Sequence, residues 1–381
     1  MIPYSTQVND LSSGMRVALI YLGRRGAGGW ISLELARQFQ GTFPTLAVTS
    51  SHTDQRNAWE SLNIELLSTY TYRNALSALA SLLMPIEVSR LVGKIKRFKP
   101  DVLLFPMFHP WNALIEQRMY SIPSVVFVHD PQPHPDLTGW IFGKLEQSSI
   151  RQAKRCIILS KSLTEEMLKR GVLSEQIDVI PLGPFRIAPD RKLKPLNGNI
   201  PTLLFFGRIV LYKGLDILLQ AYADVRQMHQ ARLIIAGEGD LSPYQNMLQN
   251  LPDVEVINQW IPETEIEELF LKSNLLVLPY TGASQSGVIP IAAALGIPVI
   301  ATCTGGISEQ IEDGVSGWLV QPGSKDALVA AIADALDHPE LMRQRGEALQ
   351  MRYKSQLFSW EQIARQVGES LKKAAQATGQ K

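Results

Sequence analysis

The chain has 381 residues, of which 45% are hydrophobic and 19% charged, and its formal net charge is +1 at pH 7. A single hydrophobic core rarely grows past about 250–300 residues, so this length predicts two domains. The composition is that of a soluble globular protein, and the near-zero net charge gives a nucleic-acid-binding function no support.

The charge is unevenly distributed along the chain. Residues 1–195 hold 23 Lys and Arg against 16 Asp and Glu, whereas residues 196–381 hold 14 against 20. A basic first half favours an anionic partner there, such as a lipid phosphate or a membrane surface. A chance distribution of surface charge is an equal alternative.

Cys156 and Cys303 each lie beside an apolar run, which predicts two core thiols and neither a disulfide nor a metal pair. Reduced thiols fit the cytoplasm. The polar N-terminus carries no secretory pattern, and no window holds the roughly 18–20 uncharged apolar residues of a spanning helix. We therefore expect a cytoplasmic protein.

Short β-branched runs alternate with helix-like stretches through the first half of the chain. Continuous apolar runs between amphipathic stretches predict a parallel sheet that helices cover on both faces. The expected strands are Val17–Leu22, Thr45–Ser50, Ile64–Ser68, Val102–Pro106, Val125–His129, Cys156–Ser160 and Val179–Leu182.

Leu76–Val92 is the stretch nearest to a membrane span, but a proline and two charged residues interrupt it. Four cations follow it between residues 94 and 99. We predict a helix with a basic end that packs on the core. Docking of this helix on a membrane surface is the alternative.

The second half repeats the same alternation. Its expected strands are Leu203–Phe206, Leu233–Ala236, Val254–Asn258, Leu275–Pro279, Val299–Thr302 and Gly317–Val320. Between the halves, Pro184–Pro201 holds four prolines and four positive charges, a composition that cannot continue a helix or a central strand.

We therefore expect an α/β protein with two doubly wound, Rossmann-like domains. Residues 1–184 form the first domain, 185–201 the linker, and 202–357 the second domain. The last residues, 358–381, form a helix that packs back toward the first domain. Ligands of such sheets bind beyond the carboxyl ends of the strands, so two facing sheets predict a cleft between the domains.

The segment 203–222 carries the strongest chemical signal. A strand runs into Gly207, a short loop carries Arg208 and Lys213, and Gly214 precedes an amphipathic helix. The helix N-terminus and the two cations suit an anion, which predicts a pyrophosphate site. The alternative is an ordinary turn with two solvated cations.

The pattern Gly-Arg-x4-Lys-Gly, followed by Leu-Asp-x-Leu-Leu-x-Ala, closely resembles glycosyltransferase family 4, whose members have the two-domain GT-B fold. The resemblance covers nearly the whole second half and short parts of the first. It implies that the second domain binds a nucleotide-sugar and the first domain an acceptor. It also implies that Arg208 and Lys213 hold the donor diphosphate and offset charge on the leaving nucleotide.

The segment 277–324 resembles the donor-binding stretch of this family. Ser286–Val288 lie where a strand feeds a helix, so their backbone N–H groups can face phosphate oxygens. The candidate donor-binding residues are Gly207, Asn258, Ser284, Gln285, Ser286, Gly287, Val288 and Glu309.

The chain departs from the family at one point. The commonest family pattern has Glu-x7-Glu, with one Glu near the donor sugar and the other on the ribose hydroxyls. The corresponding residues here are Ala283 and Ile291. Ribose binding must therefore use other groups, for which Ser284 and Gln285 are candidates, unless the donor site is degraded.

His129 ends an apolar strand of the first half, where an α/β sheet places its ligand groups. The resemblance implies that this histidine hydrogen-bonds a hydroxyl of the donor sugar. A histidine satisfied within a turn is the alternative. Asp130, His134 and His109 are further candidates for the acceptor side.

A glycine-rich loop follows the first strand. Gly28 and Gly29 match the loop that faces donor and acceptor in the family, and Arg24 and Arg25 suit an anionic acceptor. The spacing differs from a dinucleotide fingerprint, so an ordinary tight turn is an equal alternative.

These patterns predict a retaining glycosyltransferase with His129, Arg208 and Lys213 as catalytic residues. Its partners would be a nucleotide-sugar and a saccharide or lipid-linked acceptor of surface-polysaccharide or glycoconjugate synthesis, with no nucleic acid. We expect no cofactor and no metal, because no His/Cys cluster or Asp-x-Asp is present. The missing glutamates leave a non-catalytic binding subunit as an alternative, and a nucleotide-sugar epimerase is a further one.

Overall fold

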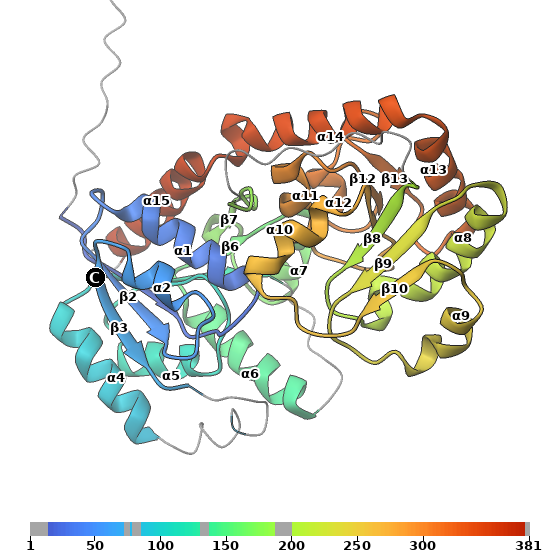
Figure 1. Ribbon diagram of the computed structural model, residues 1–381. Helices are drawn as coiled ribbons and strands as arrows, with labels where there is room; N and C mark the ends of the chain where they lie inside the picture. Colours follow the sequence, from blue (N-terminus) through green and yellow to red (C-terminus); the bar gives the residue numbers. More distant parts are fainter. Residues whose placement is uncertain (1–13, 72–76, 78–84, 130–136, 187–199, 378–381) are drawn as a thin grey trace, which may run out of the picture. The chain divides into compact units, whose positions relative to one another are not determined.

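The computed structural model describes residues 14–71, 77, 85–129, 137–186 and 200–377 (Figure 1). The chain divides into two compact units. The first comprises residues 1–158, 166–178 and 364–381, and the second residues 159–165 and 179–363. Residues 159–165 and 179–184, which we expected in the first domain, therefore group with the second unit.

The first unit contains a seven-stranded sheet in the order β3-β2-β1-β4-β5-β6-β7. Every residue of β1, β2, β4 and β5 is buried, as continuous apolar strands between two helical layers require. The strands are β1 Val17–Tyr21, β2 Thr45–Ser50, β3 Glu65–Thr69, β4 Val102–Phe105, β5 Ser124–Val128, β6 Arg155–Ile158 and β7 Ile177–Val179.

The helices of the first unit follow its strands in alternation. The last one, α15, begins in the second unit and continues into the first from Ala364. They are α1 Ala27–Phe39, α2 Arg56–Glu60, α4 Pro85–Phe98, α5 Trp111–Arg118, α6 Leu137–Gln152, α7 Thr164–Lys169 and α15 Trp360–Gln376. The first two residues of α7 and the 3-10 turn η1, Lys161–Leu163, belong to the second unit.

The second unit contains a six-stranded sheet in the order β10-β9-β8-β11-β12-β13, and all its strand pairings are parallel. Its strands are β8 Thr202–Phe206, β9 Arg232–Ala236, β10 Val254–Ile257, β11 Leu275–Leu278, β12 Val299–Thr302 and β13 Trp318–Val320. Its helices are α8 Leu215–Met228, α9 Gln245–Gln249, α10 Glu263–Leu271, α11 Ile289–Leu295, α12 Ile307–Gln310, α13 Lys325–Asp337 and α14 Pro339–Lys354, and the 3-10 turn η3 is Leu211–Lys213.

The side chains of β8 alternate between two cores. Leu203 and Phe205 pack with α8 and α13, whereas Leu204 and Phe206 pack with α10, α11 and α14. The sheet is therefore covered on both faces, which confirms the expected doubly wound α/β class with two Rossmann-like parallel sheets.

Two expectations about local structure were wrong. The strand expected at Val179–Leu182 is instead Ile177–Val179, because Pro181 has no N–H to give to a ladder. Cys303 is exposed just beyond the end of β12, while Cys156 is buried as expected. The other expected strands recur within two residues of their bounds.

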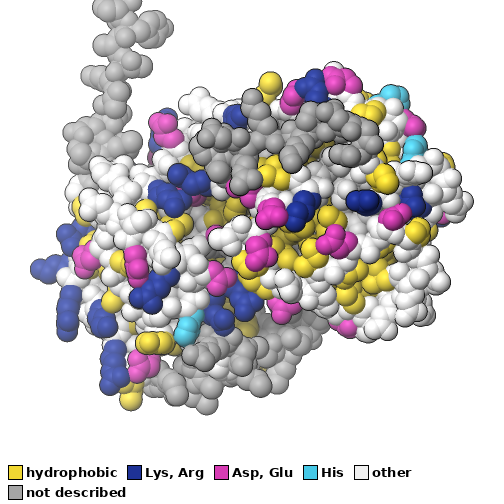
Figure 2. Space-filling model, in the orientation of Figure 1, with side chains coloured by type: hydrophobic (Ala, Val, Ile, Leu, Met, Phe, Trp, Pro, Cys, Tyr) yellow, Lys and Arg dark blue, Asp and Glu magenta, His cyan; other side chains and the backbone are white. Residues whose placement is uncertain are grey.

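Helix α4 is the described part of the basic segment that the sequence singled out. Its inner residues Val88, Leu91, Val92 and Ile95 are at most 4% exposed, so it packs on the core as predicted. Lys and Arg side chains gather at the left edge of Figure 2, around the place of α4. Among the helices that the structure describes, none is both long and apolar enough to cross a membrane.

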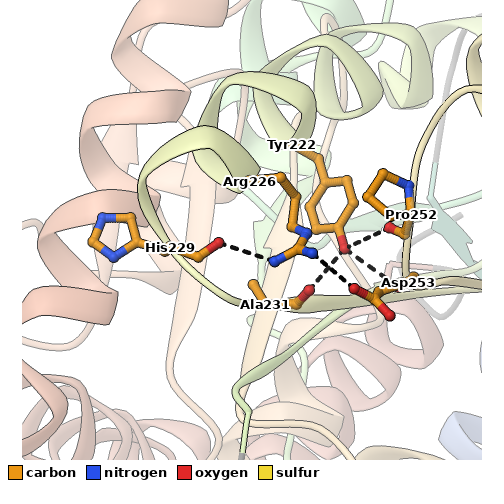
Figure 3. A network of polar contacts seen from close by, with 6 residues as sticks. All are labelled: Tyr222, Arg226, His229, Ala231, Pro252 and Asp253. Atoms are coloured by element: carbon orange, nitrogen blue, oxygen red, sulfur yellow. Dashed lines mark hydrogen bonds and ion pairs between the residues drawn. The ribbon is translucent and has the colours of Figure 1, made fainter.

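A polar clamp holds the amino ends of β9 and β10 (Figure 3). The hydroxyl of Tyr222 on α8 lies 2.9, 3.2 and 3.3 Å from the carbonyl oxygens of Ala231, Pro252 and Asp253. Arg226 donates to the Asp253 carboxylate at 2.8 Å and to the His229 carbonyl at 3.1 Å. This end of the sheet thus serves stability.

Candidate functional site

The carboxyl ends of β8 and β11 bring Lys213 and Tyr280 together. The Nζ of Lys213 donates a 2.6 Å hydrogen bond to the Tyr280 hydroxyl and lies 4.2 Å from the centre of its ring. Lys213 is 9% exposed and Tyr280 1%. A buried amine needs a counter-charge or full hydrogen bonding, and within the described residues Lys213 forms no ion pair. An anionic ligand would supply that counter-charge.

Two glycines shape the turn around this amine. A Cβ on Gly207 would lie 3.2 Å from the Nζ of Lys213, so glycine leaves the amine its space. Gly214 adopts φ 66° and ψ 33° between η3 and α8, and a Cβ there would lie 2.1 Å from the Pro279 carbonyl oxygen. Glycine is therefore required at both positions, because neighbouring atoms approach closely and the backbone of Gly214 is left-handed.

Arg208 directly follows Gly207 and is exposed. In the described part of the chain its guanidinium has neither an ion pair nor a hydrogen bond. The loop after β8 thus holds two cations. Lys213 is buried, whereas Arg208 is exposed. An exposed forked donor beside a buried amine suits a diphosphate, whose oxygens extend from the sheet edge toward solvent.

In the loop before α11, backbone N–H groups that we expected to face phosphate form hydrogen bonds within the chain. The Ser286 N–H donates to Oε1 of Gln310 at 2.8 Å, and Nε2 of Gln310 donates to the Ser286 carbonyl at 2.9 Å. The Val288 N–H points at Oγ of Ser286, 3.3 Å away. Two of the three amides assigned to phosphate are thus engaged within the chain, and their contact with phosphate stays a prediction. The Gly287 N–H has no such bond to the described residues.

Gln310 is a site-shaping residue that the sequence did not reveal. It is 6% exposed, and it also lies 3.2 Å from the Tyr353 hydroxyl on α14. Tyr280 was missed as well, although an aromatic residue directly after an apolar strand could have indicated it. Thr302 fixes Tyr280 through a 2.5 Å hydrogen bond from its hydroxyl to the Tyr280 carbonyl.

The two positions that carry glutamates in the commonest family pattern face apolar surroundings. Ile291 is 5% exposed within the core beneath α11, and Ala283 packs against the same core. Nearby, Oε1 of Gln285 is buried and accepts no hydrogen bond from the described residues. Gln285 thus offers an acceptor oxygen where the usual carboxylates are missing. The Ser284 carbonyl accepts from the Gly306 N–H at 3.0 Å.

Glu309 and Asn258, expected at the donor, are engaged in structural contacts. The Glu309 carboxylate accepts from the Ser160 hydroxyl at 2.7 Å and from the N–H groups of Lys161 and Ser162 at 3.1 and 3.2 Å, which caps η1. The Asn258 amide exchanges two hydrogen bonds with the Gly239 backbone, at 3.0 and 3.1 Å. Their polar atoms are thus used within the chain, and for both residues a role at the donor stays a prediction.

In the first unit, His129 directly follows β5 and is half-buried. Its Nε2 lies 2.7 Å from the Pro106 carbonyl oxygen, so Nε2 carries a proton that it donates there. This hydrogen bond to Pro106, which directly follows β4, sets the orientation of the His129 ring. Asp130 and His134 lie outside the described residues.

His109 is 3% exposed, and its Nδ1 accepts the Trp111 N–H at 3.1 Å. Burial lowers the pKa of His109 to about 3, so the ring is neutral at physiological pH. The ring of His109 is thus buried and neutral just before α5, and its place on the acceptor side stays a prediction.

The glycine-rich loop begins α1 where close packing demands glycine. A Cβ on Gly28 would lie 2.9 Å from Cγ of Met107, and one on Gly29 would lie 2.5 Å from Oε1 of Gln55. Arg24 is half-buried and its carbonyl accepts the Asp54 N–H at 3.0 Å, while Arg25 is exposed. Close packing against Met107 and Gln55 therefore explains the two glycines without a ligand.

Among the described residues, no group of three or more His, Cys, Asp or Glu side chains is arranged to hold a metal ion. The groups gathered at the carboxyl edge of the second sheet are instead two cations, hydroxyls and a backbone amide. Such an edge suits an anionic ligand.

Two Rossmann-like parallel sheets, the second with a cationic loop after its first strand, define a protein of the GT-B class. Residues 33–183 match the family described as Glycosyltransferase Family 4, and residues 200–338 match Glycosyl transferases group 1. The chain therefore belongs to the family-4-like glycosyltransferases, as its motifs predicted.

Individual relatives agree with this placement. A D-inositol 3-phosphate glycosyltransferase of Segniliparus rotundus is 33% identical over 289 residues, which cover 72% of this chain and 62% of that protein. A glycogen synthase of Mycobacterium tuberculosis is 26% identical, over 72% of this chain and 69% of its own.

Among solved structures, Anabaena HepE in complex with UDP and glucose aligns with a TM-score of 0.72. The alignment covers 94% of this chain and 99% of HepE at 20% identity. A likeness at this identity shows the shared fold.

Proposed function

We propose that this protein is a retaining glycosyltransferase that moves a glycosyl group from a nucleoside diphosphate sugar to a hydroxyl of a saccharide or lipid-linked saccharide. One observation carries the proposal. Lys213 holds a nearly buried amine at the carboxyl edge of the second sheet, hydrogen-bonded to Tyr280 and without an ion pair among the described residues. Retention and a role in cytoplasmic surface-polysaccharide or glycoconjugate synthesis follow from the family resemblance.

The reaction breaks the bond between the anomeric carbon and the β-phosphate oxygen and forms one to the acceptor oxygen on the same face. Lys213 and Arg208 stabilise the negative charge that develops on the departing diphosphate, and the Gly287 N–H adds a neutral donor. The acceptor's proton passes to the leaving phosphate oxygen. His129 hydrogen-bonds a sugar hydroxyl, and no metal is required by these groups.

The ribose would be held by Gln285 in place of the usual carboxylate. Its buried Oε1 can accept a hydrogen bond from a ribose hydroxyl, and an amide can do this without adding negative charge beside the diphosphate. Because HepE was solved with UDP and glucose, UDP-sugars are the first donors to test. UDP-glucose is one donor of this panel.

The test compares Lys213→Met and Arg208→Gln with wild type on a panel of nucleotide-sugars and acceptors, read by product mass. Each variant should lower kcat/KM by roughly 10²–10³-fold, because each removes a donor aimed at the leaving group. Matched controls are Lys272→Met and Arg232→Gln, which replace exposed cations of the second unit. Lys272 directly follows α10, and Arg232 begins β9. Wild-type rates in both site variants would refute the diphosphate assignment.

Ala283 and Ile291 favour one alternative, a non-catalytic binding subunit. Calorimetric titration separates the two functions. An enzyme should bind at least one nucleotide-sugar or free nucleoside diphosphate, and Gln285→Ala should weaken that binding. If no donor or nucleotide binds, the transferase proposal fails. An epimerase would leave the donor's mass unchanged and consume no acceptor.

A further inference from the structure

Helix α4 turns its apolar residues from Val88 onward into the protein. Val88 and Ile95 are fully buried, and Leu91, Val92 and Phe98 are at most 6% exposed. No apolar stripe is left to enter a bilayer or another apolar surface. Any partner of this helix must therefore bind through its polar outer face.

That outer face is a row of cations with one apolar residue at its start. Ile86, Arg90, Lys94 and Arg97 follow one another at spacings of four, four and three residues, which places them along one side of a helix. Ile86 is 63% exposed, and the three cations are exposed as well. The exposed Lys96 extends the positive charge to the flank of this row.

The charges of this row are poorly balanced. Arg90 pairs with Glu87 at 2.8 Å, the acid of the helix's first turn. Lys94 and Arg97 have no ion pair among the described residues, although they lie three positions apart, where like charges repel. An anionic partner would remove this repulsion.

A hollow of about 320 Å³ lies beside the row, between α4 and the end of edge strand β3. Thr69, Leu91 and Gly93 line it together with Arg90, Lys94, Arg97 and the Glu87 carboxylate that pairs with Arg90. Its size reaches the lower end of the range for small-ligand sites, which suits one lipid headgroup with its phosphate. The exposed side chain of Tyr70 follows β3 at the same edge, with 75% of its surface free.

We infer that the outer face of α4 docks on an anionic lipid bilayer, with headgroup phosphates on Arg90, Lys94 and Arg97. The first half of the chain, which holds 23 Lys and Arg against 16 Asp and Glu up to residue 195, adds a favourable long-range field. A flat bilayer can contact the whole row at once, since its members share one side of a straight helix. The docking is electrostatic because the apolar side of α4 belongs to the core.

Electrostatic docking makes two demands on the membrane. Binding requires anionic lipid, because a zwitterionic surface lacks the negative potential that attracts cations. Binding also weakens steeply with salt, since exposed charges are screened within about 10 Å at 0.1 M ionic strength. Insertion of apolar side chains would show neither dependence.

The experiment measures sedimentation of the full chain with vesicles of phosphatidylcholine alone and of phosphatidylcholine with phosphatidylglycerol, at low and high salt. The double variant Lys94→Gln/Arg97→Gln should bind the anionic vesicles about thirtyfold more weakly, at roughly fivefold per cation removed near the surface. Glu87→Gln should bind them about fivefold more tightly. A gain that still requires anionic lipid and low salt cannot result from misfolding, because exposed apolar surface would also bind phosphatidylcholine.

The matched control is Arg151→Gln/Lys154→Gln, which removes one Arg and one Lys, also three positions apart, exposed at the end of α6 in the same unit. It should bind like wild type. The inference is overturned if the control loses as much binding as the α4 variant, if Glu87→Gln has no effect, or if phosphatidylcholine vesicles bind equally well. Binding of inorganic phosphate or soluble glycerol phosphate without binding of vesicles also overturns it. None of these outcomes bears on the transfer reaction, which is measured with soluble acceptors.

Discussion

Among single residues, Glu116 of the first unit has a pKa that folding shifts strongly. Glu116 on α5 is 4% exposed and accepts hydrogen bonds from the hydroxyls of Ser124 and Ser149. Burial raises the pKa of Glu116 to about 7, although the two serine hydrogen bonds act in the opposite direction. Its carboxyl thus joins α5, the start of β5 and α6.

Glu116 makes stability depend on pH. Because its pKa is raised on folding, the folded state holds the proton more tightly, and stability falls as pH rises from about 4.5 through about 7. Glu116→Gln should remove this fall, a difference on the order of 3 kcal/mol at pH 8. Urea unfolding at several pH values measures it. Glu175→Gln, at an exposed position, is the control and should leave the slope as in wild type; an unchanged slope in Glu116→Gln would contradict the assignment.

The side chains of His129 and Lys213 are held in place by different kinds of contact. A single hydrogen bond to the Pro106 carbonyl orients His129, whereas Lys213 depends on Tyr280, Gly207 and the buried end of the sheet together. Lys213 is therefore preorganised by its surroundings before any ligand arrives.

Among the elements, α8 serves both ends of the second sheet. Its N-terminus follows the Gly214 turn beside the candidate site, and its Tyr222 clamps the amino ends of β9 and β10. The left-handed Gly214 and the close Pro279 carbonyl make the first end intolerant of a side chain. The two ends thus separate function from stability within one helix.

This separation predicts the effect of Tyr222→Phe. The variant leaves the buried carbonyl of Ala231 and the part-buried carbonyl of Pro252 without the hydroxyl, which should lower the free energy of unfolding by about 1–3 kcal/mol. The transfer rate below the unfolding transition should stay within twofold of wild type, as measured on the same donor panel. Tyr120→Phe, at a residue 88% exposed, should change neither quantity. A large loss of transfer with a normal melting curve would place the clamp in the site.

For the whole molecule, the two compact units have different tasks. The second unit alone contains the cationic loop after β8, the α11 loop and Gln285, while the first contains His129 and the basic face of α4. A ligand that binds one folded unit stabilises that unit by mass action. The nucleotide should therefore act on the second unit first.

Hydrogen exchange of the full chain tests this division. A nucleoside diphosphate at about a hundredfold its Kd should stabilise the binding unit by about 2.7 kcal/mol, which slows exchange of the amides of β8, β11 and α11. Lys213→Met should abolish the slowing without changing exchange in β1, β4 and β5. Equal protection of both sheets by the nucleotide alone, or protection limited to the first, would contradict a donor site on the second unit.

The sequence by itself determined the fold class, nearly all strands, the cationic loop at Arg208 and Lys213, and the family. These depend on local apolar periodicity and on residues close together in the chain, where spacing translates directly into geometry. Only the tertiary structure decided how Glu309, Asn258 and His109 are used. Glu309 meets Ser160 across 149 residues of chain, and burial rather than position neutralises His109. Whether a polar side chain is left over for a ligand depends on partners that folding brings from afar, and no short pattern contains them.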